Sequence, residues 1–321
     1  MAKAPLNRTP LMTPLAAFED LHTTAKGERR AWVDLKALST LWFNTGTLCN
    51  LTCANCYIES SPKNDALVYI TQAEVVSFLD EIQTQALPTH EIGLTGGEPF
   101  MNPEILAIIE AVLSRGLECL VLTNAMRPMM KCAEGLLALN ERYPHHLTLR
   151  VSVDHFDAAL HEEERGPRTW KPTILGLGWL AKNGFQLDVA GRTRWGEDEA
   201  TLRAGFARLF EEHGIELDAN DPQKLVLFPE MDEKAPVPEI TTECWSILGV
   251  SPNDVMCASS RMVVKHKGDD KPSVMACTLL AYDPRFNLGT TLQDAAKSVH
   301  LAHPHCAKFC VLGGGSCSVS D

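Results

Sequence analysis

Short runs of apolar and β-branched residues alternate with longer amphipathic stretches through the first 230 residues of the chain. The short runs predict strands, at residues 41–45, 91–95, 118–124, 147–154, 185–193 and 224–229. The longer stretches are apolar at i, i+3 and i+4 and predict helices, at residues 71–86, 103–115, 129–142, 171–183 and 197–213. Strands that alternate with helices form parallel βαβ units. The predicted fold class is therefore α/β, with a partial (β/α)6 TIM-like barrel whose chemistry lies at the carboxyl ends of its strands.

The alternating pattern ends at residue 229. Residues 229–239 contain three prolines and several charges, which are typical of a linker. The remaining chain lacks long helical patterns and carries six of the eleven cysteines. We therefore predict an N-terminal segment (1–37), a barrel (38–230) and a cysteine-rich region (231–321).

Composition narrows the class of protein. A chain of 321 residues with 45% hydrophobic content can bury a full core. Its net charge of −12 argues against a nucleic-acid partner, because phosphate binding needs clustered Lys and Arg. No apolar stretch is long enough to cross a membrane, and the charged, proline-containing start does not resemble a secretion signal. We therefore expect a cytoplasmic protein without a membrane partner, in which cysteines serve as metal ligands or catalytic thiols more often than as disulfides.

Three cysteines follow the first predicted strand closely. Cys49, Cys53 and Cys56 lie in the sequence CNLTCANCY, with the spacing C-x-x-x-C-x-x-C. Thiolates suit iron–sulfur clusters, in which each iron takes one cysteine sulfur. Three thiolates on a four-iron cluster would leave one iron open for a cofactor or substrate. A zinc site with a distant fourth ligand and a set of unrelated thiols are the alternatives.

Together with a second motif, this loop resembles the radical S-adenosylmethionine superfamily over residues 38–230. Tyr57 follows the third cysteine, and Gly96, Gly97, Glu98 and Pro99 form a GGEP motif after the second predicted strand. The resemblance implies that a 4Fe–4S cluster on Cys49, Cys53 and Cys56 binds S-adenosylmethionine through its open iron. It also implies that residues 96–98 hold the cofactor's amino group. Glycines would let the backbone approach the ligand, and a carboxylate would pair with an ammonium.

Further polar residues end the later strands. The resemblance puts Asn124 near the cofactor and Ser152 with Asp154 near its ribose or methionine part, and it lets Arg192 or Arg194 bind the methionine carboxylate. Helix capping is the alternative role for each of them. Our predicted cofactor-binding residues are Tyr57, Gly96, Gly97, Glu98, Asn124, Ser152 and Arg192.

The cysteine-rich region resembles the SPASM or twitch extensions of the same superfamily. Residues 257–277 have alternating strand character around a turn, so a hairpin would bring Cys257 and Cys277 together. Cys306, Cys310 and Cys317 follow at a spacing that departs from the full SPASM pattern. The resemblance therefore implies one auxiliary 4Fe–4S cluster rather than two. Its predicted ligands are Cys257, Cys277, Cys310 and either Cys317 or Cys306, with Cys244 as a substitute and a zinc site as the alternative.

The remaining cysteines and a histidine group have more ordinary interpretations. Cys119 and Cys132 fall in a predicted strand and helix, which indicates core positions. His300, His303 and His305 lie among prolines, which favours a surface loop.

The resemblance implies a function as well as a fold. A reduced cluster would cleave S-adenosylmethionine to a deoxyadenosyl radical, which would take a hydrogen atom from a small-molecule or peptide substrate. An electron donor such as flavodoxin or ferredoxin would supply the electron. The alternative function is that of an iron–sulfur electron carrier or redox sensor without catalysis.

Overall fold

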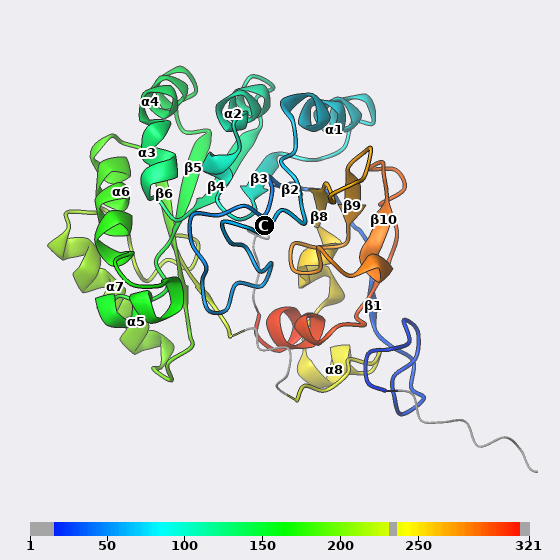
Figure 1. The fold of residues 1–321 in the computed structure, drawn as a ribbon. Coiled ribbons are helices and arrows are strands. Elements are labelled where there is room, and N and C mark those ends of the chain that lie inside the picture. The colour runs from blue at the N-terminus through cyan, green and yellow to red at the C-terminus, as the bar shows by residue number, and fades with distance from the viewer. Residues whose placement is uncertain (1–15, 231–235, 315–321) are drawn as a thin grey trace, which may run out of the picture.

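A nine-stranded sheet forms the centre of the computed structural model, which describes residues 16–230 and 236–314 (Figure 1). The strand order is β10-β9-β8-β2-β3-β4-β5-β6-β7. The parallel strands of the predicted barrel are, in chain order, β2 (Thr40–Asn44), β3 (Glu91–Thr95), β4 (Glu118–Thr123), β5 (Leu147–Ser152), β6 (Gln186–Arg192) and β7 (Leu225–Phe228). The predicted α/β class and partial (β/α)6 barrel are therefore confirmed.

Helices cover the outer side of this curved sheet (Figure 1). They are α1 (Gln72–Thr84), α2 (Ile105–Leu113), α3 (Arg127–Lys131), α4 (Ala133–Arg142), α6 (Trp170–Lys182) and α7 (Glu199–Glu212). Helix α1 begins with a capping box, in which the Thr71 hydroxyl accepts from the Glu74 amide while the Glu74 carboxylate accepts from the Thr71 amide. Apolar faces of these helices and of the strands, including Leu41, Phe43 and Ile109, form the buried core.

Two helix predictions need correction. The single helix expected over 129–142 is divided at Cys132, which ends α3 and begins α4. Proline in the first turn of α3 starts that helix earlier than we predicted, because proline suits the first helical turn. Helix α5 (Ala158–Arg165) was not predicted at all. Its buried residues are His161 and Glu164, so the segment has no apolar period to detect.

The cysteine-rich region continues the same sheet. β8 (Ser260–Val264) pairs parallel with β2 and antiparallel with β9 (Ser273–Met275), and β9 pairs with β10 (Asn287–Gly289). The predicted hairpin is thus confirmed. Residue 230 marks the end of the β/α alternation, while the sheet runs on across β8.

The N-terminal segment lies against the C-terminal part of the chain. β1 (Trp32–Val33) pairs antiparallel with β11 (Val299–His300), and the buried Arg30 forms an ion pair with Glu239 at 2.6 Å. Helix α8 (Cys244–Leu248) and a π-helix (Cys306–Val311) complete this part. In the portion of the chain that the structure describes, none of the helices combines the length and apolar character needed to cross a membrane.

Candidate functional site

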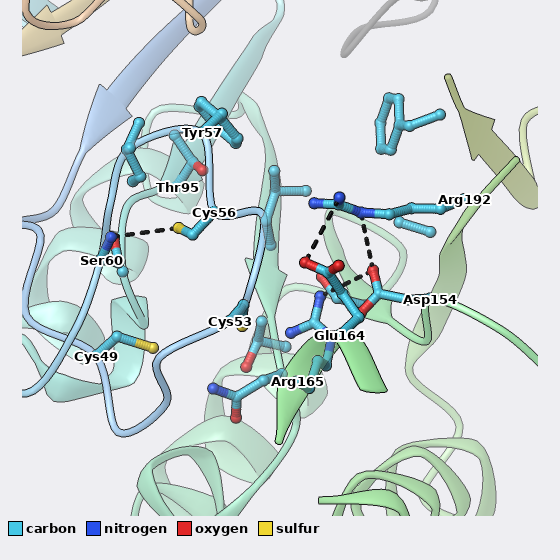
Figure 2. Close-up of a pocket in the computed structure, with 18 of the residues that line it drawn as sticks. Cys49, Cys53, Cys56, Tyr57, Ser60, Thr95, Asp154, Glu164, Arg165 and Arg192 are labelled. Atoms are coloured by element: carbon cyan, nitrogen blue, oxygen red, sulfur yellow. Dashed lines mark hydrogen bonds and ion pairs between the residues drawn. The ribbon is translucent and has the colours of Figure 1, made fainter. Parts of the chain in front are cut away.

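A cavity with a mixed polar and apolar lining opens at the carboxyl ends of the parallel strands. It has a volume of about 1100 Å³ when its part open to solvent is included. The three N-terminal cysteines line it together with Tyr57, Gly96, Gly97, Asn124, Ser152 and Arg192. Figure 2 shows the cysteine loop facing Asp154, Glu164, Arg165 and Arg192 across this space. The structure thus brings together all but one of the residues predicted for the first cluster and its cofactor.

Backbone amides support the cysteine loop from within. The Leu51 amide donates to Cys49 Sγ at 3.4 Å, and the Ser60 amide donates to Cys56 Sγ at 3.3 Å (Figure 2). Burial raises the pKa of the Cys49 thiol to about 12. It also raises the pKa of Cys53, although the positive charge of Arg165 opposes that shift. Amide donors and a nearby cation stabilise ligated thiolates, so the loop fits an iron–sulfur cluster.

The two glycines of the GGEP motif make close backbone contacts in addition to lining the cavity. A Cβ atom on Gly96 would lie 2.5 Å from the Gly46 carbonyl oxygen, and one on Gly97 would lie 2.4 Å from the Leu48 carbonyl oxygen. The Gly97 amide also donates to the Gly46 carbonyl at 2.8 Å. Both glycines therefore let residues 46–48, which lead into the cysteine loop, pack directly on the end of β3. Their contact is with protein backbone in the first place, and both still line the cavity.

Glu98 is the predicted residue that does not line this cavity in the described structure. Its carboxylate is buried, and it accepts from the Thr123 hydroxyl at 2.8 Å, the Asn124 amide at 2.9 Å and the Phe100 amide at 3.2 Å. Burial raises the pKa of Glu98 to about 7, although these donors oppose the shift. The side chain ties the end of β3 to the end of β4.

The raised pKa of Glu98 predicts a pH-dependent stability. A carboxyl whose pKa is higher in the folded chain favours folding while it is protonated. We therefore expect the free energy of unfolding to fall by about 3 kcal/mol as the pH rises from the usual pKa of 4.5 to about 7. Urea unfolding of the cluster-free chain between pH 4.5 and 8 measures this change. Glu98→Gln should flatten the dependence, and an unchanged slope in that variant would contradict the prediction.

A buried network of charges faces the cysteines from the opposite wall. Asp154 forms ion pairs with Arg165 and, at 3.2 Å, with Arg192. Burial by itself would raise the pKa of Asp154, but the two guanidinium groups outweigh it and hold the pKa below its usual range. Asp154 therefore stays ionised between two cations at neutral pH.

Glu164 connects this network to the cysteine loop. Its carboxylate accepts from the amide and the side chain of Asn55 at 2.9 and 2.8 Å, and it lies 3.6 Å from Arg192 and 3.4 Å from Arg194. Asn55 stands between Cys53 and Cys56, so α5 holds the loop in place. Sequence reasoning missed Glu164 and Arg165, although the charged run EEER before Gly166 was the available signal.

The other strand-end residues have local partners as well. Asn124 donates to the Asn50 side chain at 3.0 Å and accepts from the Met126 amide at 3.1 Å. Ser152 lines the cavity at the end of β5. Arg194, the alternative to Arg192, is absent from the described cavity lining. Its guanidinium pairs with Glu164 and with Glu230 at 3.5 Å.

A second, smaller cavity of about 350 Å³ gathers thiols of the C-terminal region. Cys257, Cys277, Cys306 and Cys310 line it, which brings together four of the five cysteines we predicted as auxiliary ligands. The fifth, Cys317, lies outside the described residues. Cys244 does not line this cavity, and its thiol contacts Thr241 at 3.4 Å.

The remaining side-chain predictions have different outcomes. Cys119 is buried in β4, as expected, and Cys132 is half-buried between α3 and α4. The surface-loop interpretation is wrong for His305, which is buried beside Cys306 at the start of the π-helix and lines the thiol cavity. The π-helix folds this proline-containing segment back against the core.

The two cavities are neighbours that share a lining residue. Leu279 lines both of them, and Phe309 lines the first while its neighbour Cys310 lines the second. The Phe309 ring stacks on Phe228 at the end of β7, with ring centroids 5.7 Å apart. Among the residues described, no three His, Cys, Asp or Glu side chains are gathered closely enough to hold a single metal ion. In the described structure the cysteines of each group therefore line a shared cavity, but their sulfur atoms do not surround a single metal position.

These features define an α/β barrel protein with a cysteine-lined cavity at the carboxyl ends of its strands. The family model of the radical SAM superfamily matches residues 43–192. Over these residues the chain is similar to enzymes of the radical SAM superfamily.

Two curated relatives match a similar part of the chain. The antilisterial bacteriocin subtilosin biosynthesis protein AlbA of Bacillus subtilis (strain 168) is 31% identical over 143 residues, which are 44% of this chain and 30% of AlbA. The AdoMet-dependent heme synthase of Methanosarcina barkeri (strain Fusaro / DSM 804) is 29% identical over 142 residues, 44% of this chain and 38% of that protein. The chain thus spans about a third of the length of these relatives.

Solved structures share the fold at lower identity. Streptococcus suis SuiB bound to S-adenosylmethionine superposes with a TM-score of 0.54 at 14% identity, covering 77% of this chain and 62% of SuiB. The anSMEcpe protein with bound AdoMet gives a TM-score of 0.56 at 16% identity, covering 80% of this chain and 79% of that one. These similarities extend beyond the family match into the cysteine-rich region.

Proposed function

We propose that this enzyme removes a hydrogen atom from a peptide or small-molecule substrate inside the larger cavity. Cys49, Cys53 and Cys56 would each bind one iron of a 4Fe–4S cluster, which would leave its fourth iron for S-adenosylmethionine. When bound, the cofactor and the reduced cluster supply the radical that attacks the substrate. The observation that carries the proposal is the single cavity lined by these three thiols, the GGEP glycines and a buried charge network.

The protein's own residues orient the cofactor and exclude water. The backbone at Gly96 and Gly97 with Asn124 and Ser152 offers hydrogen-bonding groups to the methionine part and the ribose. Arg192 offers a cation to the carboxylate, and Tyr57 closes the side next to Cys56. Glu98 contributes through Thr123 and the Asn124 amide, since its carboxylate is occupied by these donors. Such positioning is the protein's main contribution when a cofactor carries the chemistry.

We further propose that the second cavity holds one auxiliary 4Fe–4S cluster. Cys257, Cys277, Cys306 and Cys310 are its four ligands among the described residues. The proposal is supported by Leu279, which lines both cavities, because a cluster in the second cavity would neighbour the space proposed for the substrate. That position would let the substrate be oxidised after it has lost its hydrogen atom.

The substrate class rests on the relatives. AlbA is a biosynthesis protein of the bacteriocin subtilosin, and SuiB has been solved with its precursor peptide SuiA. The heme synthases among the relatives act on a different class of molecule. We therefore keep both a peptide and a small molecule as substrates, with flavodoxin or ferredoxin as electron donor in the cytoplasm.

Anaerobic reconstitution tests the enzymatic proposal. Purified protein is loaded with iron and sulfide and given S-adenosylmethionine and dithionite. We expect deoxyadenosine and methionine in equal amounts, detected by liquid chromatography. An electron carrier or redox sensor would bind iron and yield neither product, and that result would favour the alternative function.

Iron and sulfide analysis tests the auxiliary cluster separately. A variant with Cys49, Cys53 and Cys56 all replaced by Ala should retain the iron of one cluster. A variant that binds no cluster iron would contradict the auxiliary site and leave the first site untouched.

A further inference from the structure

Arg261 of β8 is fully buried and donates to the backbone carbonyl of Cys257, whose residue lines the thiol cavity. Its guanidinium donates to four backbone carbonyls and to no side chain that the structure describes. These carbonyls belong to Cys257 at 2.6 Å, Ser260 at 2.7 Å, Ala295 at 3.0 Å and Lys297 at 2.9 Å. The carbonyls satisfy its hydrogen bonds, and none of the ion pairs among the described residues gives its positive charge a counter-ion.

The other two buried arginines in the described part of the chain differ in this respect. Arg30 pairs with Glu239 at 2.6 Å, and Arg150 pairs with Asp188 at 3.1 Å. Within residues 16–230 and 236–314, no carboxylate forms an ion pair with Arg261. Since removing a charge from water costs several kcal/mol, a buried cation needs a nearby negative charge.

The groups that can supply this charge are the ligands of the proposed auxiliary cluster. Burial lowers the pKa of Arg261, and the thiols of Cys257 and Cys277 oppose that shift. Conversely, burial raises the pKa of Cys257 to about 11, and Arg261 opposes it. The hydrogen bond from the guanidinium to the Cys257 carbonyl fixes the cation next to this ligand.

We propose that Arg261 balances the negative charge of the auxiliary cluster and thereby raises the reduction potential of that cluster. A cluster held by four thiolates is anionic and becomes more so when it gains an electron. A buried cation stabilises the reduced form more than the oxidised form, because net charge is one of the factors that set the potential of an iron–sulfur cluster. Arg261 is thus a positioning residue for electron transfer. The inference rests on the proposed auxiliary cluster.

A redox titration of the auxiliary cluster alone tests this role. The full chain with Cys49, Cys53 and Cys56 replaced by Ala is loaded with iron and sulfide and titrated with dithionite under electron paramagnetic resonance. Arg261→Gln keeps amide donors for the carbonyls and removes the charge, while Arg261→Lys keeps the charge. The matched control is Lys297→Met, which removes an exposed cation whose own carbonyl binds Arg261.

We expect Arg261→Gln to lower the reduced-to-oxidised ratio at a fixed potential about tenfold, which is about 59 mV for one electron. Arg261→Lys and Lys297→Met should stay within about threefold, because the first keeps the buried charge and the second removes a screened one. An unchanged reduction potential of the cluster in Arg261→Gln overturns the inference. Failure of the Arg261→Gln chain to fold before any cluster is added overturns it as well. If the chain with Arg261 intact binds no auxiliary iron, the cluster assignment itself fails, and that result is distinguishable from an unshifted potential.

Discussion

Replacing Cys53 by Ala is expected to remove S-adenosylmethionine cleavage altogether. Loss of a residue that merely orients a metal ligand typically costs about 10–100-fold, so loss of a ligand should cost more than about 100-fold. Cys53 lies in the middle of the loop and faces Arg165, whose positive charge favours its thiolate. The measurement is deoxyadenosine formed per protein under anaerobic conditions.

Cys119→Ala is the matched control for this variant. Cys119 is buried in β4, and it lines neither of the two cavities in the described structure. The Cys119→Ala variant should therefore keep both its cluster and its activity. Full cleavage in Cys53→Ala would remove the assigned role of the loop.

Replacing Glu164 by Ala should be the most damaging change outside the ligands. Its buried carboxylate binds both polar groups of Asn55 and lies between two arginines. Breaking a buried ion pair by removing one partner costs about 3–5 kcal/mol, because the other charge is left uncompensated. We expect a loss of about that size in the free energy of unfolding, measured with urea, and less iron retained on the cysteine loop.

The neighbouring Glu163 provides a close comparison. Its carboxylate is exposed and pairs with Arg194 at 3.7 Å. Exposed ion pairs contribute about 0–1 kcal/mol, so Glu163→Ala should change neither stability nor iron content appreciably. Equal effects of the two variants would show that α5 does not hold the loop through Glu164.

Much of the fold and of the first site could be predicted from local sequence patterns. Strand positions follow from runs of buried residues, and the spacing of Cys49, Cys53 and Cys56 places their thiols on one loop whatever the rest of the chain does. The hairpin near Cys257 and Cys277 could be predicted for the same reason, since its residues are neighbours along the chain. Each of these features depends on interactions within about 20 residues.

Features that depend on polar residues or on residues far apart in the chain could not be predicted from the sequence. Helix α5 buries a histidine and a glutamate, so a search for apolar periodicity passes over it. Glu164 meets Asn55 across 109 positions, and β8 joins β2 only after the whole barrel has formed.

The amino-acid order alone therefore specifies which residues form strands and which thiols are adjacent on the chain. Three-dimensional packing specifies which residues enclose each cavity, that Leu279 lines both cavities, and that Arg261 is buried with no carboxylate partner among the described residues. The physical reason is that backbone pattern and burial are encoded locally. The partners of a buried charge and the neighbours of a cavity come from segments that meet only when the chain has folded.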